Sequence, residues 1–280
     1  MKWSFGLIAF LVLESAFVRG ETNEVAPGVL QLGTIQNASI TESSGVIPAH
    51  RRRGFFWTHN DGSEGVLYGI AADGAPAGQF TVTGAQLDDW EDIAYSAGRI
   101  YIADIGNNDG NRNHAHVYAV REPRPGSTGE VRVVKQWTLS YPNNPFDAES
   151  FVLARGYGYI VEKESGNAHV FRFRLAGSTD KTLEEQCKLN MGAPAAGADI
   201  TSDRRRLAVI SNEGAYLFAL RGKIPSEGTV DPLLFVPFAH GRMEGCCFTH
   251  DGLLVTAETG EIYLFTDPMF RIRSGVKVLQ

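Results

Sequence analysis

The stretch DWEDIAYSAGRIYIAD at residues 89–104 decides the fold, because it holds two short strand-forming runs joined by a turn with a glycine. The first run, Glu91 to Ala94, is followed by Gly98 and then by the mainly apolar run from Arg99 to Ala103. Runs rich in Ile, Val, Tyr and Phe that are bounded by Gly, Asn and Asp are typical of antiparallel strands. The pattern predicts a β-hairpin, and beyond residue 40 the chain shows little helical periodicity.

This hairpin pattern occurs five times along the chain. First strands begin at residues 44, 91, 149, 198 and 244. Second strands are predicted at 55–58, 99–103, 157–161, 207–210 and 253–256. Third strands, each with an aromatic residue near the centre, are predicted at 66–70, 116–120, 169–173, 215–219 and 261–265. Candidate fourth strands lie at 79–83, 133–139, 187–191 and 233–238.

Four antiparallel strands repeated at about 45 to 50 residues are the signature of a β-propeller blade. We therefore predict an all-β fold, a single β-propeller of five blades, with six as the alternative if the long interval from 91 to 149 holds two. The fifth repeat lacks a fourth strand after residue 265. We expect the N-terminal strand at 29–35 to close the ring and remove its open edges, a role that residues 276–279 could also fill.

Composition narrows the function classes. The chain has 280 residues, 43% of them hydrophobic, with 26 Lys+Arg against 32 Asp+Glu and a formal net charge of -6. An acidic balance argues against nucleic-acid binding, and the apolar content argues against disorder. Three cysteines do not make a disulfide framework, so we expect them to pack in the core.

Residues 1–20 have the pattern of a secretory signal peptide: Lys2, an apolar run from Trp3 to Leu13, and smaller residues up to Gly20. We expect one propeller domain over residues 21–280, secreted or periplasmic and monomeric. The apolar run is short for a transmembrane anchor, which is the alternative reading, and no other segment approaches spanning length.

One set of matching positions suggests a metal site. In a propeller the first strands begin, and the second strands end, at the same mouth of the central channel. Ser44, Glu91, Glu149 and Glu244 start first strands there, and Ala198 holds the remaining position. Carboxylates that face a narrow axis repel one another unless a cation is present, and an all-oxygen set favours Ca²⁺. The alternative is that these acids bind backbone amides of neighbouring blades and no metal.

The ends of the second strands and the loops after them add polar residues to the same mouth. His59 is the candidate for acid–base catalysis, with Asp104 or Asp61 to orient it. The candidate ligand-binding residues are Asn60, Asp61, Asn107, Arg112, Glu162, Lys163, Asn212 and Glu258. Solvated loops have a similar composition, so a structural role is the alternative for each.

Two arginine triplets, at residues 51–53 and 204–206, lie in turns between first and second strands. These turns belong to the face opposite the proposed site. We expect them to be solvated, with an anionic surface partner as the alternative.

The segments DWEDIA (89–94), IYIADIGNN (100–108), DAE (147–149) and GADI (197–200) resemble a group of secreted bacterial β-propeller proteins without an assigned activity. A more distant resemblance is to the calcium-activated apyrases, five-bladed propellers that hydrolyse nucleotides around a central Ca²⁺. That resemblance implies that Ser44, Glu91, Glu149 and Glu244 hold the ion. Ala198 departs from the family pattern, which leaves its carbonyl, Asp199 or a water to complete the shell. The acidic nucleotide-handling segment of the apyrases has no counterpart in residues 21–41.

Two functions follow from these features. The first is a propeller with a central Ca²⁺ that binds a small polar molecule, a glycan or a protein at the channel mouth. The second is a Ca²⁺-dependent hydrolase of phosphate or other esters. The sequence contains no serine-nucleophile elbow and no phosphate loop, so we favour binding.

Overall fold

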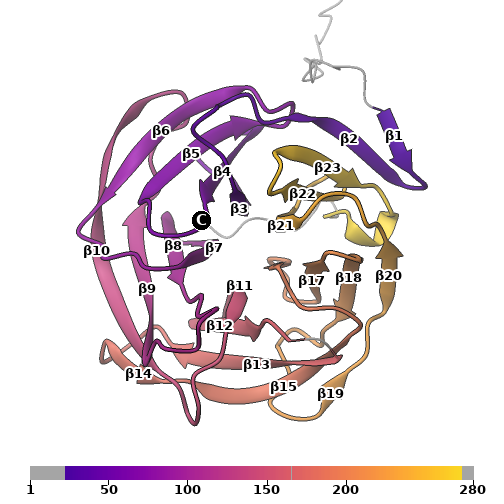
Figure 1. Ribbon diagram of the computed structural model, residues 1–280. Helices are drawn as coiled ribbons and strands as arrows, with labels where there is room; N and C mark the ends of the chain where they lie inside the picture. The colour runs from indigo at the N-terminus through magenta and orange to yellow at the C-terminus, as the bar shows by residue number, and fades with distance from the viewer. Residues whose placement is uncertain (1–22, 165, 273–280) are drawn as a thin grey trace, which may run out of the picture.

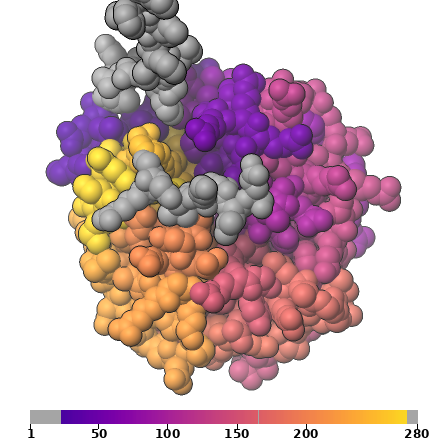
Figure 2. Space-filling view, turned by 180° about the vertical axis from the view of Figure 1, so that it is seen from behind, coloured from indigo at the N-terminus to yellow at the C-terminus, as the bar shows by residue number. Residues whose placement is uncertain are grey.

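The computed structural model describes residues 23–164 and 166–272. Its strands stand around a ring (Figure 1), and the space-filling view from behind shows successive segments following one another around a disc (Figure 2). The prediction of an all-β propeller is confirmed. The predicted signal peptide and the alternative closing strand at 276–279 lie outside the described residues.

Strand pairing divides the chain into antiparallel units of four strands, which we number as blades in chain order. Blade 1 contains β3 (Ser43–Pro48), β4 (Phe55–Asn60), β5 (Val66–Ala71) and β6 (Pro76–Thr83). Blade 2 contains β7 (Trp90–Ser96), β8 (Arg99–Asp104), β9 (His114–Arg121) and β10 (Thr128–Ser140). Blade 3 contains β11 (Ala148–Ala154), β12 (Tyr157–Glu162), β13 (Gly166–Arg174) and β15 (Glu184–Met191).

The last two blades follow the same order. Blade 4 contains β16 (Gly197–Ile200), β17 (Arg206–Ser211), β18 (Gly214–Ala219) and β20 (Leu234–Pro237). Blade 5 contains β21 (Met243–Phe248), β22 (Leu253–Ala257), β23 (Glu261–Phe265) and, as its outer strand, β2 (Val29–Thr34). The additional strands are β1 (Asn23–Ala26), β14 (Asp180–Thr182) and β19 (Thr229–Val230), and a 3-10 turn, η1, covers Pro268–Phe270.

The inner strands close a complete circle around the axis. β3 contacts β7, β7 contacts β11, β11 contacts β16, β16 contacts β21, and β21 contacts β3 again. The N-terminal strand β2 pairs antiparallel with β23, with Val29 opposite Phe265. The predicted closure by the N-terminal strand is therefore confirmed, and it joins the two ends of the described chain in one sheet.

The long interval between the second and third repeats holds only the four strands of blade 2. It is filled by the loop of residues 105–113 and by β10, which has 13 residues. The first part of β10 pairs in parallel with β6 of blade 1, and its last part pairs in parallel with β14. The extra length therefore joins neighbouring blades at the rim.

The hydrophobic core lies between the blades. Because side chains alternate along a strand, Cys246 packs in the cluster shared with blade 4, and Cys247 packs in the cluster shared with blade 1. Cys187 is buried between blades 3 and 4. All three thiols are free, as expected for small core residues.

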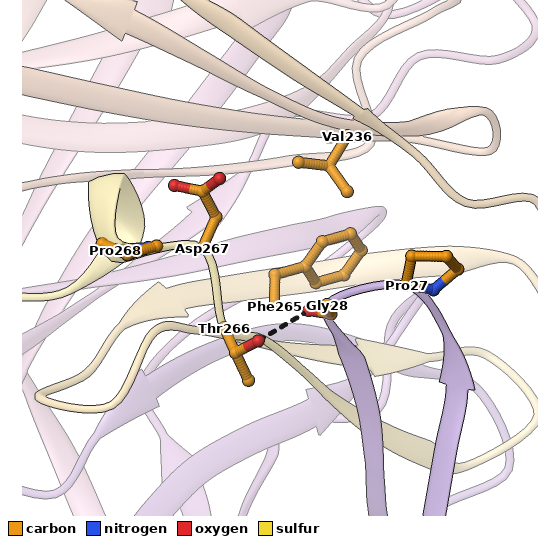
Figure 3. A pocket seen from close by; sticks show the side chains of 7 residues that line it. All are labelled: Pro27, Gly28, Val236, Phe265, Thr266, Asp267 and Pro268. Carbon is orange, nitrogen blue, oxygen red and sulfur yellow. Dashed lines mark hydrogen bonds between the residues drawn. The ribbon is translucent and has the colours of Figure 1, made fainter.

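The seam between blades 4 and 5 lacks a parallel strand pair among the described strands, as does the seam between blades 5 and 1. Outer strands of blades 1, 2 and 3 each gain a parallel partner from the next blade, whereas β20 pairs only with β18 among the described strands. A hollow of about 280 Å³ lies beside it, lined by Pro27, Gly28, Val236, Phe265, Thr266, Asp267 and Pro268 (Figure 3). The Thr266 hydroxyl donates to the Gly28 carbonyl at 3.1 Å and ties β23 to the β1–β2 turn.

Within residues 23–164 and 166–272, no helix has the length and apolar character needed to cross a membrane.

Candidate functional site

The candidate site lies at the mouth of the channel where the inner strands begin. The second strands end at the same place: Ser43 at the start of β3 is opposite Asn60 at the end of β4, and Trp90 is opposite Asp104. We call this region the acidic mouth, and define it by Asp61, Asp89, Glu91, Asp147, Glu149, Glu244 and Glu258. Burial, followed by the charges of neighbouring acids, raises the pKa values of Asp61, Asp89, Glu91, Glu149 and Glu244.

Three of these acids form a compact group. Carboxylate oxygens of Asp61, Asp89 and Glu91 lie within 4.8 Å of one another. Glu91 is 3% exposed, and its Oε1 is buried without a hydrogen-bond partner. Burial, helped by the charges of Asp61 and Glu149, raises the pKa of Glu91 to about 11, and burial raises the pKa of Asp89 to about 6. The group is thus a concentrated set of oxygen donors. None of its three acids forms an ion pair with a described residue, and the cations Arg112 and Lys163 act on it only from a distance.

Gly106, in the loop after β8, brings the backbone against this group. A Cβ atom at this position would lie 2.2 Å from Glu91 Oε1 and 2.4 Å from Asp89 Oδ2. The Gly106 amide donates to the Asp89 carbonyl at 3.1 Å. Only glycine allows this approach, which explains the glycine of the DIGNN segment.

Glu149 and Glu244 lie at the start of the inner strands of blades 3 and 5. The Lys163 ammonium contacts the Glu149 carboxylate directly and lies 3.7 Å from Asp147 Oδ2. Burial raises the pKa of Glu149 to about 7 even though Lys163 acts to lower it. Burial, followed by the charge of Glu149, raises the pKa of Glu244 to about 8.

Glu258 is held at the rim by Arg242, whose Nη1 donates to Glu258 Oε2 at 2.9 Å. Its charge raises the pKa values of both Asp61 and Glu244. The predicted residues Asp61, Glu91, Glu149, Lys163, Glu244 and Glu258 are thus brought into one electrostatically coupled region.

Ser44 and Asp199, both predicted as metal ligands, have other partners. The Ser44 hydroxyl donates to the Glu91 carbonyl at 2.6 Å. Asp199 accepts hydrogen bonds from the Ile200 amide with Oδ1 and from the Phe248 amide with Oδ2, both at 2.8 Å. Its carboxylate therefore ties blade 4 to blade 5 instead of adding to the acidic mouth.

Asp92 shows the same arrangement in blade 2. Its two oxygens accept from the Ile93 and Phe151 amides, each at 2.7 Å. Asp199 thus corresponds to Asp92, and Ala198 corresponds to Glu91, so blade 4 offers no acid at the glutamate position.

His59 does not have the surroundings of an acid–base catalyst. Its side chain is 0% exposed, Nδ1 is 2.8 Å from the Asn60 carbonyl, and the ring stacks on Trp90 with centroids 4.1 Å apart. Burial lowers the pKa of His59 to about 3. The imidazole is therefore neutral and shielded from solvent, which argues against the predicted catalytic role.

Asp104 and Arg112 hold the rim loops together. Asp104 is 0% exposed, and its Oδ1 accepts from the Asp89 amide at 2.8 Å and from Arg112 Nη2 at 2.9 Å. Arg112 also donates to the Gly106 carbonyl and pairs with Asp88 at 3.3 Å. The arginine thus folds back on its own loop instead of reaching over the mouth.

Asn60 and Asn107 are structural in the same sense. Asn60 Oδ1 accepts from the Thr41 amide at 2.9 Å, and its Nδ2 donates to the Ser39 carbonyl at 2.8 Å. Asn107 is 3% exposed, and its Oδ1 accepts from the Arg112 amide at 2.9 Å. Both side-chain amides shape loops and have few atoms left for a ligand.

The remaining two predicted residues lie in other surroundings. Glu162 groups with Glu164 and His169, whose donor atoms lie within 4.8 Å of one another, and His169 pairs with Glu185 at 2.9 Å. Asn212 is exposed in the turn between β17 and β18.

Asp89 and Asp147 belong to the acidic mouth but were missed by the sequence interpretation of the site. Each lies two residues before a first-strand glutamate, in the segments DWE and DAE. Asp147 Oδ1 accepts from the Asn107 amide at 2.7 Å, which links blade 3 to the loop of blade 2. The repeated Asp-x-Glu spacing was the signal in the sequence.

Comparisons with known proteins identify no family and give only distant structural similarities. Neither the protein-family models nor the curated protein sequences give a match. Among solved structures, the WD40 repeats of RRP9 show 9% identity and a TM-score of 0.48, with coverage of 86% of this chain and 98% of that one. A nidogen/laminin complex chain gives 12% identity, a TM-score of 0.45 and coverage of 78% and 73%. The Dos1 propeller gives 13% identity and a TM-score of 0.39, with coverage of 80% of this chain and 56% of that one.

Proposed function

We propose that this protein is a calcium-binding β-propeller that uses a cation at the acidic mouth to bind a polar ligand or a partner. The observation that carries the proposal is the buried, unpartnered Oε1 of Glu91, next to the carboxylates of Asp61 and Asp89. A buried carboxylate without a partner is unfavourable in its charged form. A bound cation removes that penalty by supplying the missing counter-charge.

The donor set fits a hard cation. The group consists of carboxylates, with the further acids Asp147 and Glu149 close enough to act on the pKa of Glu91. Oxygen ligands of this kind suit Ca²⁺, which accepts six to eight oxygens in flexible geometry. Zn²⁺ is disfavoured because no cysteine or solvent-facing histidine belongs to the group.

The polar ligand would meet the cation at an exposed edge. Asp61 and Lys163 lie toward solvent at the rim, while Glu91 lies inside. An anionic or hydroxyl-bearing ligand could therefore reach the metal from outside and contact the Lys163 ammonium. The secretory pattern of residues 1–20 supports a secreted or periplasmic protein, where Ca²⁺ is abundant.

A second candidate function is Ca²⁺-dependent hydrolysis of phosphate or other esters. The observation that favours it is Glu149, a carboxylate with a pKa of about 7 beside a half-buried lysine. A group with such a pKa is suited to proton transfer at neutral pH. Turnover of nucleotides, phosphoesters, lactones or aryl esters that stops with a chelator would support this candidate, and absence of turnover across the panel would leave binding.

Terbium luminescence tests the cation site. Trp90 lies between Asp89 and Glu91 in the chain, so Tb³⁺ bound there should be excited through this tryptophan. We expect saturable luminescence that Ca²⁺ displaces and that the variant Asp89→Asn/Glu91→Gln lacks. Glu213→Gln, which removes an exposed acid from a blade 4 turn, is the control and should leave the signal unchanged. Equal luminescence in all three proteins would reject the site.

A further inference from the structure

The face opposite the acidic mouth is dominated by arginine. It is formed by the turns between first and second strands, and these turns, with the strand starts beside them, hold arginine at residues 51–53, 99, 155 and 204–206. We call these residues the arginine face. The acids in the same turns are Asp203 and Asp251. The turns between first and second strands thus hold eight arginines against two acids in a chain with a net charge of -6, while the connections between third and fourth strands also hold acids, among them Asp73, Glu122, Glu227 and Asp231.

Three arginines of this face contact the neighbouring blade. Arg51 donates to the Glu122 carbonyl of blade 2 at 3.4 Å, and Arg155 donates to the Gly222 carbonyl in the blade 4 connection at 2.9 Å. Arg206 donates to the Arg271 carbonyl, after blade 5, at 2.9 Å. Arginines thus bridge three of the five seams between blades.

The bridging arginines donate their hydrogen bonds to backbone carbonyls and form no direct ion pair with a described residue, although Arg51 lies near Glu122 and Arg206 near Asp203. Arg53, Arg99 and Arg205 are exposed, as is Arg124 in the adjoining turn of blade 2. None of the four has a side-chain hydrogen bond or ion pair to any described residue. The nearby Glu122 is 2% exposed, and its Oε1 accepts from the His50 amide at 2.7 Å, so its charge points inward.

The arginine of blade 3 lies in a tight turn. Arg155 and Gly156 have φ angles of 52° and 79°, the combination of a two-residue turn between twisted strands. The hollow beside β20 lies between blades 4 and 5, and its lining residue Pro268 adjoins Met269, whose carbonyl accepts from Arg206. The arginine face therefore offers a broad layer of cations, and a layer fits an extended anionic surface better than a small molecule.

We propose that the arginine face docks the protein onto a bilayer rich in anionic phospholipid. Guanidinium groups bind phosphate oxygens in bidentate fashion, and each arginine near an anionic membrane strengthens binding by about fivefold. The acidic mouth then points away from the bilayer, toward solvent and its ligand. This inference is independent of the cation site, because it uses the other ends of the strands.

Vesicle co-sedimentation of the full chain tests the proposal. The probes are vesicles of phosphatidylglycerol mixed with phosphatidylcholine, and vesicles of phosphatidylcholine alone. We expect binding to the first and not the second, and weaker binding as NaCl rises from about 50 to about 300 mM, because salt screens exposed charges. Equal binding to both vesicles would overturn the proposal, since it would show apolar insertion.

A charge-matched pair of variants locates the surface. The face variant replaces Arg53, Arg99, Arg124 and Arg205 by Gln, and the control variant replaces Arg132, Arg172, Lys181 and Lys188, on β10, β13, β14 and β15, by Gln. Both variants lose the same charge and keep the same N-terminal segment. We expect the face variant to lose at least tenfold in partition, and the control variant to change by less than about threefold.

Equal losses in the two variants would overturn the assignment to this face. The face variant should keep the wild-type melting temperature, because its four side chains touch no described partner, and a lowered melting temperature would be checked with each single substitution. Binding to soluble heparin without binding to anionic vesicles would also overturn the membrane proposal, and would assign the arginine face to a polyanionic polymer.

Discussion

The two faces of the disc are built from opposite ends of the same strands, but they differ in the sign, burial and pairing of their charged side chains. At the acidic mouth all the carboxylates except the exposed Asp61 are partly or fully buried, and the cations Arg112, Lys163 and Arg242 are each paired with an acid. On the arginine face, the exposed Arg53, Arg99 and Arg205 form no ion pair with a described residue. Inner strands bring the acids toward one axis, whereas the turns spread the arginines over a layer. The difference indicates a point-like ligand at one face and an extended partner at the other.

The largest expected effect is the separation of these two faces by mutation. Asp89→Asn/Glu91→Gln should abolish the Ca²⁺-induced rise in melting temperature, which for a ligand at 100 times its Kd corresponds to about 2.7 kcal/mol. The same variant should bind anionic vesicles as the wild type does, and the four-arginine face variant should keep the full Ca²⁺ response. Thermal unfolding and vesicle binding of both variants check this, and loss of both properties in either variant would contradict it.

Gly106→Ala should produce the next largest effect. The added methyl group would lie 2.2 Å from Glu91 Oε1, so the carboxylate or the loop must move. We expect a loss of about 1–3 kcal/mol in stability and at least tenfold weaker binding of Ca²⁺. Gly129→Ala is the control, because its Cβ would meet only the Phe80 ring at 3.4 Å. Wild-type affinity in Gly106→Ala would show that the cation does not bind beside this loop.

The pH dependence of stability should sharpen the contrast between buried acids and exposed arginines. Glu149 and Glu244 have pKa values of about 7 and about 8 in the folded state, above the value near 4.5 of an unperturbed glutamate. The folded state therefore binds more protons than the unfolded state. The stabilisation that these two glutamates contribute is complete below about pH 4.5 and is lost as the pH rises toward 8.

Without Ca²⁺ we expect the melting temperature to fall by several degrees between pH 5.5 and pH 8, and saturating Ca²⁺ should reduce this fall. Scanning calorimetry with and without a chelator measures it. A melting temperature that rises over this range in the chelator would contradict the assigned pKa shifts. The face variant should show the same profile as the wild type.

Asp199→Asn should give the smallest effect. The carboxylate accepts two amide hydrogen bonds, and an asparagine NH2 group cannot accept one of them. We expect a loss of about 1–3 kcal/mol in stability with Ca²⁺ affinity unchanged. Chemical denaturation and a Ca²⁺ titration distinguish this role from ligation, because a lost Ca²⁺ response would return Asp199 to the metal site.

Much of the fold could be predicted because the repeat appears in the local strand pattern. The predicted second, third and fourth strands correspond to observed strands in each blade, and closure by residues 29–35 follows from the missing fourth strand of the last repeat. The parallel joins through β14 and β19 were not predicted, since strands of two or three residues leave no periodic signal.

The site was only partly predictable. The first-strand glutamates Glu91, Glu149 and Glu244 were found because register places them at one mouth, but register does not reveal which polar side chains turn inward. His59 and Asn60 end β4 as expected and are buried by the loops around them. Asp199 was predicted as a metal ligand, but it corresponds to Asp92 and not to Glu91. These two positions are neighbours in the strand, so their side chains point to opposite faces.

Calorimetric titration with Ca²⁺ in buffers of different ionisation enthalpy, at pH 7, tests the central claim most directly. The acids of the mouth have raised pKa values, so a cation that binds them must release protons. The account predicts saturable Ca²⁺ binding with net proton release, both absent in Asp89→Asn/Glu91→Gln. Binding without proton release, or the same titration curve in that variant, would contradict a cation site at the acidic mouth.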